Sequence, residues 1–200
     1  MKKINQNEII APFYKFGIRS MSVGFLMEDT APGVWRGPVL HTILQRMISG
    51  VDWGHCNVLI VDLPPGTGDV LLSLSSLLPQ AGIITVTMPQ EVATQDAMRF
   101  MNAGQRLNLS LMGVVENFSG FTTPEGKKHW IFGKGKGEEL AKNFQCPFLG
   151  SFEILPQVSQ SASDGVPIAF HCGEGDVAGE FSSLSKKILE QTTMNPFSCH

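Results

Sequence analysis

Short apolar runs alternate along the chain with segments whose apolar residues recur at helical spacing. The clearest run is Val58 to Asp62, almost entirely β-branched or aliphatic before its closing aspartate, as is typical of a strand buried on both faces. Such runs alternating with helical segments favour a parallel sheet covered by helices. The pattern therefore predicts an α/β fold with a mostly parallel sheet, and ligands at the carboxyl ends of its strands.

Local sequence signals set the bounds of the predicted elements. Pro38 stands in the first turn of a helix, where a missing N–H costs nothing, and Asp69 can cap the next helix by accepting a free backbone N–H. A loop after residue 115 suggests a hairpin that ends at residues 129–133. We expect one domain over residues 1–200, frayed at 1–16 and 192–200. The predicted strands are 18–25, 58–62, 83–87, 111–115 and 148–152, and the predicted helices are 37–49, 69–78, 91–106, 138–144, 156–163 and 177–191.

Composition narrows the classes of function. Hydrophobic residues make up 42% of the chain and charged residues 16%, as in a compact globular protein. The formal net charge is -3, and lysines gather only at positions 127, 128, 134 and 136, so nucleic acid is not an expected partner. No apolar run approaches the roughly 20 residues that span a bilayer, and residues 1–13 do not resemble a secretory signal. We expect no membrane segment and a cytoplasmic location, or the mitochondrial matrix in a eukaryote.

The cysteines are far apart and include no CxxC pair, which argues against a disulfide framework and against a metal or iron–sulfur site built within one chain. Reduced thiols are the expectation, and a metal gathered by the His–Cys neighbours at 171–172 and 199–200 is the weaker alternative. The four cysteines are Cys56, Cys146, Cys172 and Cys199.

The stretch DLPPGTGD, residues 62–69, carries the most suggestive chemistry. Asp62 is predicted at the carboxyl end of a central strand, where an aspartate can order the water shell of a magnesium ion. Gly66 and Gly68 lack a Cβ, so their N–H groups can approach a phosphate closely. From these residues alone a structural role is equally open, in which Asp62 caps its own turn or pairs with a lysine.

Several separated motifs together resemble one family. DLPPGTGD occurs with VWRGP at 34–38, TMPQEVATQDA at 87–97, GVVENFS at 113–119 and IFGKGKGEELA at 131–141. In this order they resemble the Mrp/ApbC family of P-loop ATPases, which includes the mitochondrial Ind-type proteins and is related to MinD and ParA. The resemblance implies the SIMIBI-type P-loop NTPase fold. It also implies an ATP-binding, magnesium-dependent homodimer that carries a 4Fe-4S cluster to client proteins.

The resemblance assigns roles to three residues. Asp62 is similar to the Walker B aspartate, which is catalytic and holds magnesium through water, and Gly66 is similar to a switch II glycine near the γ-phosphate. Asn117 is similar to the asparagine whose side-chain amide contacts adenine. Without the family context, a helix or turn cap is the more frequent role for such an asparagine.

The chain departs from the family in the phosphate-binding part. Members place a KGGVGKST-like loop well before DLPPGTGD, and its backbone N–H groups and lysines hold the phosphates. The sequence contains no GK[ST], and the strand before that loop and the helix after it are missing too. We expect weakened ATP and magnesium binding, and no substantial ATP hydrolysis by this chain alone. The chain is then a piece of a longer protein, a truncated product, or one that recruits another subunit.

Two further departures concern the cluster and the base. Where members commonly carry CPxC, this chain has Thr123 and Gly126, neither of which can replace a thiolate. We therefore expect no iron–sulfur ligands by the usual route. In SFEILPQ, residues 151–157, Glu153 and Leu155 replace a proline and an aspartate of the family pattern, so we expect weaker base recognition.

The sequence thus predicts an ATP-dependent iron–sulfur cluster carrier of the Mrp/ApbC type, incomplete in its phosphate site, with client proteins and a homologous partner subunit as its partners. Two alternatives stay open. One is a non-catalytic subunit that dimerises with an intact homologue. The other is a MinD/ParA-like regulatory switch, for which WRGP and ENFS are poorer matches.

Overall fold

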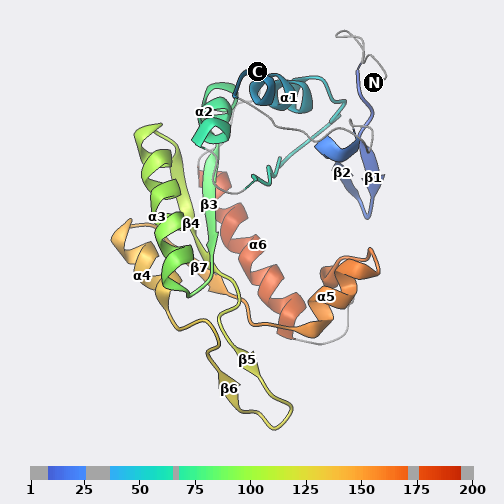
Figure 1. Cartoon of the computed structure of the whole chain (residues 1–200). Helices are drawn as coiled ribbons and strands as arrows, with labels where there is room; N and C mark the ends of the chain where they lie inside the picture. The colour runs from blue at the N-terminus through green and yellow to red at the C-terminus, as the bar shows by residue number, and fades with distance from the viewer. Residues whose placement is uncertain (1–8, 26–36, 65–67, 171–175, 195–200) are drawn as a thin grey trace. The chain divides into compact units, whose positions relative to one another are not determined.

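The computed structural model describes residues 9–25, 37–64, 68–170 and 176–194 (Figure 1). The chain divides into two compact units, residues 1–79 and 80–200, and each is described by itself. The prediction of a single domain therefore stays a prediction.

Two helices form the core of the N-terminal unit, α1 (Gly37–Ser49) and α2 (Gly68–Leu77). They pack through Leu44, Val70 and Leu74, all buried. Asp69 lies in the first turn of α2 and not before it, because the helix already begins at Gly68. An acidic side chain in this turn still stabilises the free N–H groups of the helix.

The strand predicted at residues 18–25 is confirmed only over Ile18–Ser20 and is wrong beyond it. The structure has an antiparallel hairpin of β1 (Phe13–Lys15) and β2 (Ile18–Ser20), followed by the 3-10 helix η1 (Val23–Phe25). Phe16 and Gly17 both have positive φ, 54° and 76°, as a two-residue hairpin turn requires. β2 stays short because the chain leaves the extended conformation after Ser20 and forms η1 from Val23. β1 also falls within the N-terminal stretch that we expected to be frayed.

The strand predicted at residues 58–62 is also wrong. These residues are not in a strand, and the side chains of Val58, Leu59 and Ile60 are 46%, 39% and 87% exposed. A strand needs a neighbour for its backbone N–H and C=O groups, and no described segment pairs with this one. The apolar composition is that of a strand, but the partner is not among the described residues.

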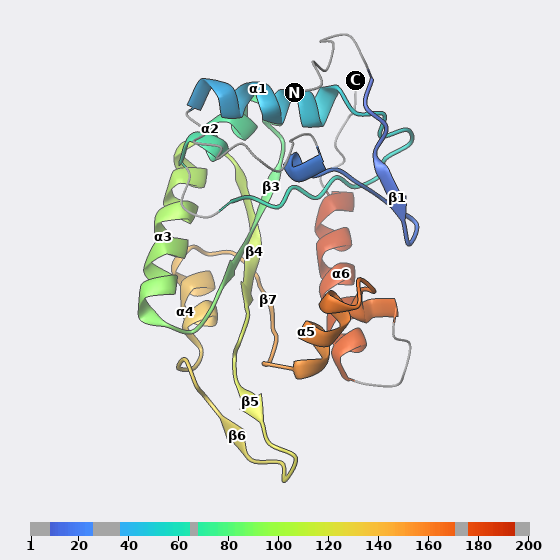
Figure 2. The ribbon, with the colours of Figure 1, turned by 45° about the vertical axis from the view of Figure 1, so that its right-hand side comes forward.

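The C-terminal unit confirms the predicted alternation of strands and helices, with bounds that shift by one or two residues in most elements. Its three-stranded parallel sheet has the order β3-β4-β7. A second hairpin, β5–β6, follows β4 as predicted and projects from the sheet in both views (Figures 1 and 2). The elements are β3 (Gly82–Thr87), α3 (Glu91–Arg106), β4 (Ser110–Glu116), β5 (Phe121–Thr122), β6 (Lys128–His129), α4 (Lys136–Asn143), β7 (Phe148–Ser151), α5 (Pro156–Ser163), η2 (Ile168–Phe170) and α6 (Asp176–Met194).

The main core of this unit lies between the sheet and the helices α3 and α4, which cover the same face (Figure 2). Met101, Val114 and Leu140 are buried there to 1% exposure or less. Helix α6 lies against β7, where the Phe152 and Phe181 rings are 4.6 Å apart and the Lys187 Nζ donates to the Leu149 carbonyl at 2.7 Å. No helix in the described ranges has the length and apolar character needed to cross a membrane.

Candidate functional site

Asn117 follows directly on β4 at the carboxyl edge of the sheet. Its N–H donates to the Thr87 carbonyl at the end of β3, with an N to O distance of 2.7 Å. Its side-chain Oδ1 accepts the Phe118 N–H at 3.0 Å. This bond fixes the amide, because only the oxygen can accept from a backbone N–H. The Nδ2 donors then have no partner within the described part of the chain, and Oδ1 keeps a second lone pair.

Hydrogen bonds tie the loop that carries Asn117 to the segment that follows β7. Ser119 donates from its N and its Oγ to the Phe152 carbonyl, at 2.9 and 3.1 Å. The Phe152 N–H donates to the Glu116 carbonyl, and the Ile154 N–H to the Gly120 carbonyl, both at 2.8 Å. The two stretches that the resemblance assigns to the base, GVVENFS and SFEILPQ, thus lie side by side.

Glu116 anchors this edge from the other face of the strand, and the sequence analysis missed it. The residue is 4% exposed, and its carboxylate accepts the Gly137 N–H in the first turn of α4, at 2.7 Å. A Cβ on residue 137 would come within 2.8 Å of the Glu116 Cβ, so only glycine fits there. Two sequence signals could have revealed this contact: a charged residue at the end of an otherwise apolar strand, and a glycine at the start of a helix.

Glu153 has a role that the sequence did not reveal. Its carboxylate accepts the Thr122 hydroxyl at 2.8 Å and pairs with the Lys128 ammonium at 2.5 Å. Lys128 first, and then the Thr122 hydrogen bond, lower the pKa of Glu153 below its usual value. Sequence reasoning treated Glu153 only as the loss of a family proline, whereas the structure shows it joining the segment after β7 to the β5–β6 hairpin.

Thr123 and Gly126 lie in the turn of that hairpin. The Thr123 N–H donates to the Lys127 carbonyl and the Gly126 N–H to the Thr123 carbonyl, both at 2.9 Å. The Lys127 N–H donates back to the Thr123 Oγ1 at 3.3 Å, and Gly126 has a φ of 82°. Both residues therefore serve to close the turn.

The described residues contain no group of three or more His, Cys, Asp or Glu side chains that could hold a metal ion. Cys56 is exposed, and Cys146 is half-buried, with burial raising the pKa of its thiol. The other two cysteines and their neighbouring histidines lie outside the described residues.

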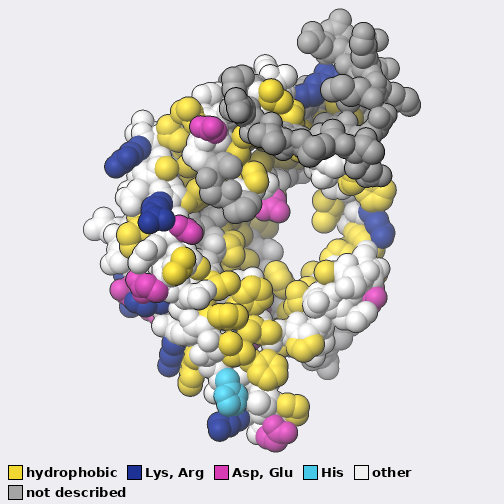
Figure 3. Space-filling model, in the orientation of Figure 1, with side chains coloured by type: hydrophobic (Ala, Val, Ile, Leu, Met, Phe, Trp, Pro, Cys, Tyr) yellow, Lys and Arg dark blue, Asp and Glu magenta, His cyan; other side chains and the backbone are white. Residues whose placement is uncertain are grey.

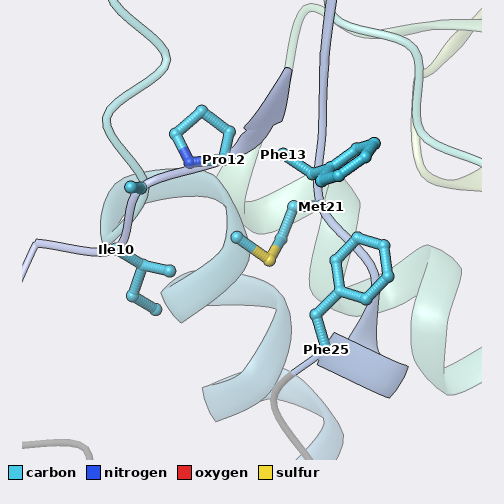
Figure 4. A pocket seen from close by; sticks show the side chains of 6 residues that line it. Ile10, Pro12, Phe13, Met21 and Phe25 are labelled. Atoms are coloured by element: carbon cyan, nitrogen blue, oxygen red, sulfur yellow. The ribbon is translucent and has the colours of Figure 1, made fainter. Parts of the chain in front are cut away.

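Of the two predicted phosphate-side residues, the structure describes only Asp62. Asp62 is exposed on the unpaired segment of the N-terminal unit, and its carboxylate has no hydrogen bond or ion pair with any described residue. Gly66 lies outside the described residues. A pocket in the same unit is lined by apolar side chains, with no lysine or arginine among them (Figure 4). Its lining residues are Ile10, Ala11, Pro12, Phe13, Met21 and Phe25.

A parallel sheet flanked by helices, with polar residues at its carboxyl edge, is the architecture of the P-loop NTPases, and solved members of that class match this chain. A nucleotide-binding protein from Archaeoglobus fulgidus, in complex with ADP, superposes with a TM-score of 0.64 and 26% identity over 78% of this chain and 60% of its own. The cell division ATPase MinD of Pyrococcus furiosus shares the fold, with a TM-score of 0.53 and 17% identity over 78% of this chain and 59% of its own.

A family profile described as ParA, NUBPL iron-transfer P-loop NTPase, matches residues 1–189. The chain belongs to this family. It is 36% identical over 191 residues to an iron-sulfur cluster carrier protein of Synechocystis sp., covering 94% of this chain and 54% of that protein. It is 33% identical over 195 residues to the mouse iron-sulfur cluster transfer protein NUBPL, covering 97% of this chain and 61% of that protein. The chain thus spans about half to three-fifths of the length of these two relatives.

Proposed function

We propose that this chain acts in iron–sulfur cluster transfer as an adenine-nucleotide-binding member of its family, with Asn117 recognising the base. The fixed amide of Asn117 is the observation that carries the proposal. An amide presents a donor and an acceptor side by side, which matches the N7 acceptor and N6 donor of adenine. Guanine has an oxygen at position 6, which would face Oδ1 without a hydrogen. The ADP complex of the Archaeoglobus relative supports an adenine nucleotide as the ligand.

The phosphate side remains the weaker half of the proposal. Asp62 would order the water shell of magnesium, and Gly66 would donate its N–H to the terminal phosphate. The sequence has no GK[ST], the end of the glycine-rich loop that cradles the phosphates in this class of protein. Because most phosphate contacts in such sites come from that loop and its lysine, we expect the chain alone to bind ATP weakly and to hydrolyse it negligibly.

The proposed cargo is a 4Fe-4S cluster, delivered to client proteins by a homodimer or by a dimer with a homologue. The Synechocystis and mouse relatives, named as iron-sulfur cluster carrier and transfer proteins, support this class of cargo. Thr123 and Gly126 offer no thiolate, and the raised pKa of the Cys146 thiol disfavours its thiolate form. We therefore expect that this chain does not hold the cluster by itself. Anaerobic reconstitution with iron and sulfide tests this, since a stable 4Fe-4S absorbance in the chain alone would contradict it.

A non-catalytic subunit that pairs with an intact homologue is the second candidate function. It is favoured by Thr123 and Gly126, whose use in closing the hairpin turn is a structural role in place of the cysteine ligands. Such a subunit would contribute base contacts and surface, and its homologue would supply phosphate and cluster ligands.

The base contact can be tested directly. The side-chain amide of Asn117 is followed by NMR while millimolar ATP or GTP is added to the full chain. We expect its signal to shift with ATP at lower ligand concentration than with GTP. Asn117→Ala should weaken ATP binding about tenfold, since such a paired contact is worth about 1–3 kcal/mol.

Asn102→Ala, on the exposed surface of α3, is the matched control and should bind as the unchanged chain does. Circular dichroism checks that both variants fold. Equal affinity for ATP and GTP, or unchanged binding by the Asn117 variant, would contradict the assignment of Asn117 to the base.

A further inference from the structure

One carboxylate contacts both strands of the β5–β6 hairpin. The Glu153 Oε2 accepts the Thr122 hydroxyl of β5 at 2.8 Å, and its Oε1 pairs with the Lys128 ammonium of β6 at 2.5 Å. Thr122 and Lys128 are directly opposite each other, at the last pair of the two strands before the turn. In Figure 3 basic and acidic side chains lie together at the lower end of the view, where Figure 1 shows this hairpin. Glu153 therefore joins both strands at once to the segment that follows β7.

The surrounding backbone leaves room for this ion pair. A Cβ on residue 120 would lie 2.9 Å from the Lys128 Cε, so a side chain in place of Gly120 would push the lysine off its path to Glu153. The Ile154 N–H donates to the Gly120 carbonyl at 2.8 Å, which keeps Glu153 beside the start of β5. The side chains of Glu153 and Lys128 are 25% and 42% exposed, so the pair is partly shielded from solvent and salt. Glycine at position 120 and the adjacent backbone hydrogen bond thus both favour the pairing.

The segment that carries Glu153 also borders the loop that carries Asn117. Three hydrogen bonds of 2.8 to 3.1 Å join residues 152–154 to residues 119–120. The loop then leads directly into β5, which begins at the next residue. A ligand that orders this loop would therefore also order the start of β5 and the segment after β7. Because Glu153 links that segment to both strands of the hairpin, the effect of such a ligand would extend to the hairpin turn.

We propose that Glu153 is a positioning residue that holds the hairpin against the segment after β7 and thereby couples the base side to the hairpin turn. The hairpin then has two arrangements, one held by Glu153 and one released, and a ligand at Asn117 favours the first. The hold on the hairpin follows from the contacts of Glu153, whereas its coupling to an adenine nucleotide rests on the proposed function. Because the ion pair is partly exposed, the coupling should change ATP affinity only about two- to fivefold.

Amide hydrogen exchange of the full chain, followed by NMR without nucleotide, tests the hold on the hairpin. The Ile154 and Thr123 N–H groups donate to the Gly120 and Lys127 carbonyls, so their exchange reports release of the hairpin. Glu153→Gln should speed the exchange of both at least about threefold. The matched control Glu138→Gln, which breaks an ion pair with Lys142 on α4, should leave it within about 1.5-fold.

Exchanging the two charges, in a Glu153→Lys, Lys128→Glu double variant, should slow the exchange again relative to Glu153→Gln. A residue that only fills space would show no such rescue. Unchanged exchange in Glu153→Gln, or a double variant that exchanges faster than the single one, would overturn the hold on the hairpin.

Adding ATP to the same samples tests the coupling. In the unchanged chain, the Asn117 side-chain amide and the Thr123 and Gly126 N–H signals should shift over the same range of ATP concentration. In Glu153→Gln the Asn117 signal should still shift, and the shifts in the turn should fall to about a third or less. Turn signals that shift equally in both chains, or that stay in place while Asn117 shifts, would overturn the coupling. An Asn117 signal that ATP does not move would contradict the proposed function and the coupling with it, and hydrogen exchange would still decide the hold on the hairpin.

Discussion

Two apolar runs of similar composition adopt different structures in this protein: one forms a paired strand and the other does not. Residues 83–86, Ile-Ile-Thr-Val, form the middle of β3, hydrogen-bonded to β4 along six residue pairs and covered by α3. Residues 58–61, Val-Leu-Ile-Val, belong to no strand, and Ile60 is 87% exposed. The difference lies in what surrounds each run, because β propensity describes how well a side chain fits a paired, half-buried surface. A strand-like sequence becomes a strand only where a neighbour satisfies its backbone.

The loop that carries Asn117 and the segment that carries Asp62 differ in the same way: the first follows a paired strand and the second does not. Asn117 follows a paired strand, and five hydrogen bonds join its loop and the end of β4 to β3 and to the segment after β7, at distances from 2.7 to 3.1 Å. Asp62 follows the unpaired run and has no such support among the described residues. Among the described residues, hydrogen bonds therefore hold the loop that carries Asn117, and none holds the Asp62 side chain.

The largest difference in stability should be found between truncating a buried side chain of the C-terminal unit and truncating an exposed one of the unpaired run. Leu140→Ala removes a side chain that is 1% exposed, so we expect the free energy of unfolding to fall by about 2–5 kcal/mol. Ile60→Ala, in the unpaired run, should change it by less than about 0.5 kcal/mol. Urea denaturation followed by circular dichroism measures both. A cost for Ile60→Ala as large as that for Leu140→Ala would mean that the run at 58–61 is packed in solution.

The buried acid at the end of β4 should give the next largest effect. Glu116→Ala leaves the Gly137 N–H without its acceptor and opens a small cavity, so we expect a loss of about 1–3 kcal/mol. Glu116→Gln keeps an acceptor oxygen at nearly the same place and should lose less. Equal losses in the two variants would show that the carboxylate charge, and not the hydrogen bond, stabilises the start of α4.

The smallest effect concerns Glu153 and pH. Its folded-state pKa lies below that of an unfolded glutamate, which is about 4.3. The stabilisation is therefore complete above the unfolded pKa and is lost as pH falls through the folded one. For this partly exposed pair we expect less than about 1 kcal/mol.

The difference in unfolding free energy between the unchanged chain and Glu153→Gln should be constant from about pH 7 to pH 5, and should shrink below pH 4. Urea denaturation of both chains across this range measures it. A difference that grows on acidification would show that the ion pair with Lys128 does not stabilise the fold.

The C-terminal unit was predictable because its signals are local. Helix α3 has the predicted bounds, since Pro89 ends the preceding strand and apolar residues then recur at helical spacing up to Arg106. The errors concern segments whose structure depends on pairing with another strand. The predicted strand at 18–25 ends at Ser20 and pairs with β1 in a hairpin, and the run at 58–61 has no neighbour among the described residues. At the candidate site, Asn117 follows the end of β4 as its motif predicts, and its role in base recognition stays a prediction. The partners of Glu116 and Glu153 are distant in sequence, and no local pattern predicts them.

Calorimetry of magnesium–ATP binding tests the central claim most directly, namely that this chain organises the base side of a nucleotide site and not its phosphate side. The chain is compared with a variant that carries an added N-terminal segment containing the KGGVGKST-like loop. We predict a Kd no tighter than about 1 mM for the unchanged chain, and binding at least ~100-fold tighter for the variant. Micromolar binding by the unchanged chain would contradict the claim.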